Sequence, residues 1–218
     1  MTASRRCPLH PLPTAGAGLL LAVLLAARPA SAGINLHNKC AFALGVYARS
    51  GSNPTYPYYL KPGAQQWLDF GPANLWPAGV IWASKSNNTN NGQATEIEFT
   101  IGGDMGNGLK QDFYDISLVN AYNHPVLVTP LNPPSVSGNW CGSPSCTISS
   151  LSGFCKLPNY LTGKDPACIN KDGPGLVATT GTKAFKTACP KAYSYSKDDA
   201  TSTFSCKWGT NYNVIFCP

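Results

Sequence analysis

The stretch EIEFTI at residues 96–101 shows most clearly the pattern that decides the fold. Apolar and polar side chains alternate along it in the order Glu96, Ile97, Glu98, Phe99, Thr100 and Ile101. Because successive side chains of a β-strand point to opposite faces, this alternation predicts a strand with one buried and one exposed face.

Other segments repeat this alternation. Near the beginning, six apolar side chains predict one face of a strand or strand pair: Ile34, Leu36, Cys40, Phe42, Leu44 and Val46. Further strands are predicted at 112–120, at 126–128 and at 212–216, and Gly- and Pro-containing turns separate the runs at 61–63, 71–72 and 106–108. Many short strands joined by such turns favour an all-β fold, an antiparallel sandwich or flattened barrel.

One helix is predicted, over roughly residues 182–188. Its residues are compatible with a helix, and Cys189-Pro190 ends it because proline cannot continue a helix.

Residues 1–32 have the features of a secretory signal peptide. Arg5 and Arg6 form a basic head, an apolar run covers residues 15–27, and Ala30-Ser31-Ala32 supplies small residues for cleavage after Ala32. The alternative is a membrane anchor, but a spanning helix needs about 20 apolar residues. We therefore expect a secreted, extracellular protein that begins at Gly33.

The charge of the predicted mature chain is mildly basic. Without Arg5, Arg6 and Arg28, 13 basic residues face 10 acidic ones, a net charge of about +3. This is far from the balance of a nucleic-acid-binding protein. The residues from 138 onward hold 8 basic and 4 acidic side chains. They form either an ordinary solvated surface or one that meets an anionic wall or fungal membrane.

The cysteines indicate a disulfide framework. Of nine cysteines, Cys7 lies in the predicted signal peptide, and eight remain: Cys40, Cys141, Cys146, Cys155, Cys168, Cys189, Cys206 and Cys217. An even number in an exported chain predicts four bridges, for which about 105 connectivities exist. A zinc site is not expected, because the cysteines form no paired CxxC knuckles and only His37 and His124 follow the signal. Six of the eight lie between 141 and 206, which suggests a β core with a small cross-linked lobe inserted before the last strand.

A modification site is predicted at Asn87. Asn87-Asn88-Thr89 is an N-glycosylation sequon within a polar stretch typical of an exposed loop.

Four motifs resemble the thaumatin-like (osmotin-type, pathogenesis-related) family. They are DFYDISLVNAYN at 112–123, CPKAYSY at 189–195, DDATSTFSC at 198–206 and TNYNVIFCP at 210–218. The resemblance covers nearly the whole predicted mature chain and is strongest from about Glu96 onward. It implies a flattened β-sandwich core, here 33–137 and 190–218, a disulfide-rich lobe at 138–189, and a cleft between them.

The resemblance also implies the disulfide pairing. Carried over by position, the bridges are Cys40–Cys217, Cys141–Cys206, Cys146–Cys189 and Cys155–Cys168. Typical members have sixteen cysteines and a shorter form has ten, so this chain is a simplified member. The family's glycine- and cysteine-rich signature loop is replaced by the Asn-rich stretch around 87–92.

The family's cleft is lined by one arginine, one glutamate and three aspartates. By resemblance the glutamate corresponds to Glu98 and the aspartates to Asp115, Asn120 and Asp198, while the arginine position is Val80. Two of the five positions therefore differ, and both differences change the charge.

Glu98 and Asp115 are the candidate catalytic pair. They lie on strands that we expect to be neighbours, and two carboxyls beside a glycosidic bond can act as general acid and base, or as acid and nucleophile. One of them must hold its proton near neutral pH, which burial or a nearby like charge favours. The alternative is that alternation alone places polar residues on an outer face, and that Asp198 only caps or turns the chain.

Other chemistries have little support in the sequence. His37 and His124 are isolated, and the glycines at 102–103 and 106–108 belong to a hairpin-like turn rather than a phosphate loop. Five aromatic residues either stack on sugar rings or pack the fold: Tyr56, Tyr58, Tyr59, Trp67 and Trp76.

The expected function is that of a secreted defence protein that binds fungal cell-wall polysaccharide, such as β-1,3-glucan, through its acidic cleft. The alternatives are a weak endo-β-1,3-glucanase, an inhibitor of a microbial glycosidase, or a protein that permeabilises fungal membranes. We expect a monomer without cofactor, metal or nucleic-acid partner.

Overall fold

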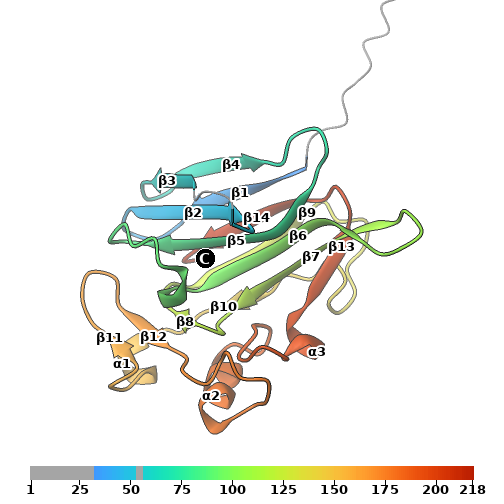
Figure 1. Ribbon diagram of the computed structural model, residues 1–218. Helices are drawn as coiled ribbons and strands as arrows, with labels where there is room; N and C mark the ends of the chain where they lie inside the picture. Colours follow the sequence, from blue (N-terminus) through green and yellow to red (C-terminus); the bar gives the residue numbers. More distant parts are fainter. Residues whose placement is uncertain (1–31, 53–55) are drawn as a thin grey trace, which may run out of the picture.

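The computed structural model describes residues 32–52 and 56–218. The predicted signal peptide therefore lies outside the described residues, except for Ala32. In the described part, a six-stranded and a five-stranded sheet pack against each other, and a small three-stranded sheet and the helices gather on one side of them (Figure 1). The fold is mostly β, as the alternation predicts.

The six-stranded sheet carries the polar face described below. Its strand order is β13-β7-β6-β5-β2-β3. The strands are β2 (Leu44–Ser50), β3 (Tyr56–Leu60), β5 (Trp76–Ser84), β6 (Glu96–Asp104), β7 (Lys110–Ser117) and β13 (Phe204–Lys207). All neighbours in this sheet are antiparallel.

The five-stranded sheet closes the other side of the core, in the order β10-β9-β14-β1-β4. Its strands are β1 (Gly33–Asn38), β4 (Gln65–Asp69), β9 (Val126–Leu131), β10 (Ser145–Cys146) and β14 (Asn211–Phe216). The pair β1–β14 is parallel, so the sandwich is not purely antiparallel. The early alternating run forms two strands, β1 and β2, which lie in different sheets and both contribute to the core.

The core between the sheets is filled by aliphatic and aromatic side chains. Phe99 of β6 meets Tyr212 of β14 edge to face at 5.2 Å, and Tyr114 of β7 lies beside both rings. Each such side chain contributes about 1.5–3 kcal/mol when fully buried. The apolar half of the alternating pattern thus faces inward and leaves the polar half on the outer face.

Short elements of the lobe, and others that lie outside residues 138–189, complete the fold. These are β8 (Ala121–Tyr122), β11 (Tyr160–Leu161), β12 (Ala167–Ile169), α1 (Leu151–Phe154), α2 (Thr180–Ala188), α3 (Asp199–Ser202) and the 3-10 turn η1 (Asn91–Gln93). Helix α2 is the predicted helix, but it begins two residues earlier because Thr179 and Thr182 form a capping box. Among the described residues, no helix has the length and apolarity needed to cross a bilayer.

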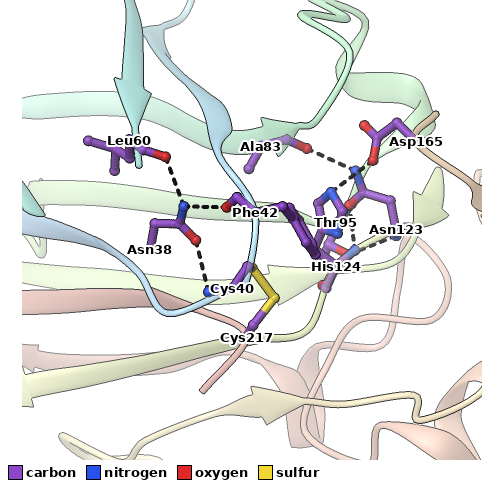
Figure 2. The surroundings of a disulfide bond; sticks show 10 residues. All are labelled: Asn38, Cys40, Phe42, Leu60, Ala83, Thr95, Asn123, His124, Asp165 and Cys217. Carbon is purple, nitrogen blue, oxygen red and sulfur yellow. Dashed lines mark hydrogen bonds and ion pairs between the residues drawn. A yellow bond between two sulfur atoms is a disulfide. The ribbon is translucent and has the colours of Figure 1, made fainter. Parts of the chain in front are cut away.

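Four disulfides join the chain in the pairing that the resemblance implies. They are Cys40–Cys217, Cys141–Cys206, Cys146–Cys189 and Cys155–Cys168. The first links the loop after β1 to the residue that follows β14, 177 positions away (Figure 2). The third ties the end of α2 to β10, and the fourth closes the lobe on itself. These cross-links hold the lobe against the sheets.

Candidate functional site

A groove of about 480 Å³ lies on the outer face of the six-stranded sheet. A second hollow of about 330 Å³ continues it toward the lobe, because both are lined by Glu96, Glu98, Asp115 and Asn120. Arg49 and Val80 line the groove at the sheet end, whereas Tyr193 and Asp199 line it at the lobe end. The cleft implied by the resemblance is therefore present, with an acidic floor.

A row of side chains crosses four neighbouring strands at this groove. Arg49 of β2 is the register partner of Val80 on β5, and Val80 is in turn the partner of Glu98 on β6. Glu98 is then the partner of Asp115 on β7. Residues directly opposite each other in a sheet share a face. The sheet register therefore brings the two predicted carboxylates together, as the sequence suggested for neighbouring strands.

The carboxyl groups of Glu98 and Asp115 interact directly. A side-chain hydrogen bond joins them, in which a proton on Asp115 is favoured. Burial, followed by the charges of Glu98 and Glu96, holds the pKa of Asp115 well above its usual range. Glu98 opens into the groove, yet partial removal from water by the groove walls and the charge of Glu96 raise its pKa too. Among the described residues, the buried Asp115 Oδ1 has no hydrogen-bond partner.

Glu96 is a third carboxylate of the groove, and the sequence analysis missed it. It lies two residues before Glu98 on the same face of β6, so strand alternation was the signal that could have found it. Its carboxylate accepts hydrogen bonds from the side-chain amides of Asn91 and Asn120. Burial raises the pKa of Glu96, although these two bonds and the charge of Arg49 oppose the rise.

The contacts of Asn120 explain why an asparagine can stand where the resemblance implies an aspartate. Its Nδ2 donates a hydrogen bond of 2.8 Å to Glu96 Oε2. An ionised aspartate at this position would place a further negative charge beside Glu96. The amide replaces that repulsion with a donor.

The second difference from the family pattern is Val80, which stands where the resemblance implies an arginine. Val80 is only 7% exposed and packs in a small apolar cluster with Tyr47, Trp82 and Ala94. Arg49, its partner on the next strand, places its guanidinium 5.5 Å from the centre of the Trp82 ring. The groove therefore contains an arginine, which comes from β2 rather than from the expected position on β5.

Asp198 does not lie where we expected it. Its carboxylate makes a 2.9 Å ion pair with Lys186 and accepts hydrogen bonds from the backbone and hydroxyl of Ser194. It is largely buried by these contacts and does not line the groove. The next residue, Asp199, lines the lobe end instead and accepts a hydrogen bond from Tyr193. Sequence position alone did not separate these two adjacent carboxylates.

The predicted aromatic residues do not gather at the groove. Tyr59 is 68% exposed, Trp67 is partly exposed, and Trp76 stacks on Phe70 at the edge of the core. Tyr58 lines a separate hollow, and the side chain of Tyr56 lies outside the described part. No residue of the set lines the groove within the described chain.

The remaining predicted positions have these surroundings. Asn87 is exposed, as a glycosylation site requires, and its modification stays a prediction. His124 is not isolated: its Nε2 lies 2.8 Å from Asp165 Oδ1, and both side chains are buried. Across residues 32–52 and 56–218, no group of three or more His, Cys, Asp or Glu side chains is arranged to hold a metal ion.

Comparison with known proteins identifies the family. "Thaumatin-like protein 1" of Arabidopsis thaliana is 33% identical over 85% of each chain. "Pathogenesis-related thaumatin-like protein 3.2" of Cryptomeria japonica is 44% identical over 49% of this chain and 48% of its own. The solved structure of a thaumatin-like xylanase inhibitor aligns with 86% of this chain and all of its own, at 13% identity and a TM-score of 0.45. The family model for the thaumatin family matches residues 83–218. The chain therefore belongs to the thaumatin family.

Proposed function

We propose that this protein is a secreted, defence-type protein that binds a fungal cell-wall glycan, β-1,3-glucan, through the groove on its six-stranded sheet. The observation that carries the proposal is the row of Arg49, Glu98 and Asp115 across one face of the sheet. A guanidinium only donates hydrogen bonds, and a carboxylate only accepts them. A sugar hydroxyl does both, so a polyhydroxylated ligand matches both ends of this row.

The carboxyl pair favours binding over hydrolysis. Retaining glycosidases hold their two carboxyls about 5–5.5 Å apart, and inverting ones about 6.5–9.5 Å apart. The carboxyls of Glu98 and Asp115 are directed at each other, rather than at the two sides of a bound glycosidic bond. In the arrangement seen here, Glu98 offers acceptor oxygens to a ligand, and the hydrogen bond from Asp115 holds the Glu98 carboxylate in place.

Secretion and a defence role have separate support. The four disulfides are typical of a protein in an oxidising compartment. Export by the predicted signal peptide would place the chain in such a compartment. Several relatives bear the description "pathogenesis-related" in their names. These observations concern the compartment and the relatives, and the glycan itself is inferred from the groove.

The test is cosedimentation of the oxidised protein with insoluble β-1,3-glucan, with cellulose as the competing polymer. We expect retention on β-1,3-glucan, and about tenfold weaker retention of Glu98→Gln, since a charged acceptor is lost. Asp104→Asn is the matched control, because Asp104 is an exposed carboxylate at the end of the same strand and does not line the groove. Equal retention of all three proteins would contradict the proposal.

A weak endo-β-1,3-glucanase is the second candidate. Its support is the raised pKa of Asp115, since a general acid must keep its proton near neutral pH. Release of reducing ends from β-1,3-glucan by the wild type, lost in both Glu98→Gln and Asp115→Asn, would establish it. Binding without release would leave a binding protein.

A further inference from the structure

Arg49 is chemically unusual in this chain. The sequence has four arginines, Arg5, Arg6, Arg28 and Arg49, and all other basic side chains from residue 33 onward are lysines or histidines. Arg49 is thus the sole arginine of the predicted mature protein. It lies in the groove, at the end opposite to the lobe.

The guanidinium of Arg49 is held in place but not saturated. Its contact is with the ring face of Trp82, which is buried and stacks on Tyr47 with ring centres 5.5 Å apart. Within residues 32–52 and 56–218, the guanidinium has no hydrogen bond or salt bridge to another side chain. An arginine that stacks on a fixed aromatic ring while its donors stay free is oriented to bind a ligand.

The strands that carry Arg49 and the carboxyl pair are not adjacent: β5 lies between β2 and β6, and β7 lies one strand further. Neighbouring strands lie about 4.8 Å apart, so the three steps from β2 to β7 span roughly 14 Å, and the two steps to β6 about 10 Å. The residue between them in the row is the apolar Val80, next to Gly79. The groove therefore has two polar ends separated by an apolar floor.

We propose that Arg49 forms a second sugar-binding subsite, which holds a different unit of the glycan from the one at Glu98 and Asp115. This rests on the proposed function and adds that the ligand is an oligosaccharide spanning both ends. A neutral glycan suits the site better than an acidic one, because Glu98 and Asp199 would repel an anionic chain beyond the reach of Arg49. The guanidinium donates to ring or hydroxyl oxygens of the distal unit, whose apolar face lies over Val80.

The test is a length series of β-1,3-linked gluco-oligosaccharides, from two to six units, titrated calorimetrically into each protein. For Arg49→Gln we expect about tenfold weaker binding of the longer members and unchanged binding of the disaccharide. Arg49→Lys keeps the charge but loses the planar guanidinium, so its affinity for the longer members should lie between those of the wild type and Arg49→Gln. Glu98→Gln weakens binding at every length. Lys61→Gln, an exposed charge outside the groove, is the control, and thermal unfolding confirms that each variant is folded.

Failure of the inference and failure of the proposed function give different results. If the wild type binds but the loss in Arg49→Gln is the same at all lengths, or absent, the second subsite is overturned while glycan binding stands. If the wild type binds no member of the series, both are overturned.

Chemical modification gives an independent measurement on the wild-type protein. In protein that begins at Gly33, an arginine-selective 1,2-dicarbonyl has one target, and mass spectrometry of the peptide that contains Arg49 measures its modification. We expect protection by the hexasaccharide and none by the disaccharide. Equal modification in the presence of either sugar would overturn the subsite.

Discussion

Glu98 and Asp115 face each other directly across β6 and β7, and their carboxyl groups share a hydrogen bond on the floor of the groove. With Glu96 two residues away, three carboxyls lie in one partly desolvated region. Like charges this close together cannot all be ionised without a cost, so protons remain bound at a pH where free carboxyls have lost them.

The first prediction concerns the dependence of stability on pH. Burial raises the pKa values of Glu96, Glu98 and Asp115, and it raises the pKa of Asp112 to about 6. In the folded protein these carboxyls hold their protons more tightly than in the unfolded chain, where the pKa is about 4, and this tighter proton binding stabilises the fold. The stabilisation is full below about pH 4 and is lost as the pH rises through the folded pKa. The free energy of unfolding is therefore expected to be higher at about pH 5 than at about pH 7.5. Urea denaturation at both values measures it, and a rise over this interval would contradict the assignment.

The second prediction isolates the pair. Asp115→Asn replaces a carboxyl whose pKa burial raises well above its usual range with a neutral group of the same shape. We expect the free energy of unfolding at neutral pH to be the same as in the wild type or higher. Its decrease as the pH rises should be smaller than in the wild type. Asp104→Asn, at the exposed end of β6, should leave the pH profile as it is. A clear loss of stability in Asp115→Asn at neutral pH would mean that an ionised Asp115 holds the sheet together.

The third prediction concerns the buried contact between His124 and Asp165, which fastens a lobe loop to the sheets beside the Cys40–Cys217 disulfide (Figure 2). Burial would raise the pKa of Asp165, but the hydrogen bond and charge of His124 outweigh it, so the pKa is lowered. This contribution is present above the unfolded pKa and is lost as the pH falls through the folded pKa. Asp165→Ala should lower the free energy of unfolding by about 1–3 kcal/mol at neutral pH, since it leaves the buried imidazole of His124 without its hydrogen-bond partner.

Chemical denaturation of Asp165→Ala beside Asp172→Ala provides the comparison for that prediction. Asp172 is a lobe carboxylate that accepts an exposed hydrogen bond from Thr179. Asp172→Ala should therefore lower the free energy of unfolding by much less than Asp165→Ala. Equal costs would show that the His124 contact adds little.

The fourth prediction ranks two disulfides. Cys40–Cys217 closes a loop of 177 residues and Cys155–Cys168 one of 13. In the chain-entropy model the first contributes about 5 kcal/mol and the second about 3 kcal/mol. The double Cys→Ala variant of the long-range bridge should therefore lose more stability than that of the lobe bridge. Guanidinium denaturation of both variants measures the difference, and the reverse order would contradict the model for this chain.

Much of the fold could be predicted because it depends on local patterns. Alternation over residues 96–101 and 212–216 gave strands with the correct buried faces, and the proline after Cys189 gave the end of α2. The bridges followed from the resemblance, since spacing alone leaves many connectivities open. The alternation near Ile34 could not show that β1 and β2 belong to different sheets, because strand pairing depends on distant partners.

The candidate site could be predicted only in part, for the same reason. Glu98 and Asp115 were singled out by the resemblance to the thaumatin-like family, and the strand pattern added only that they lie on strands expected to be neighbours. Arg49 was missed because its role follows from its register with Val80, which the sequence does not contain. Asp198 and Asp199 were exchanged because only the contact with Lys186 decides which of the two points away from the groove.

The most direct test of the central claim is calorimetric titration of a β-1,3-linked glucohexaose into the wild-type protein, Glu98→Gln and Asp104→Asn. The account predicts saturable binding by the wild type and by Asp104→Asn, with about tenfold weaker binding by Glu98→Gln. Absence of binding by the wild type, or equal binding by all three, would contradict the assignment of the groove as a glycan-binding site.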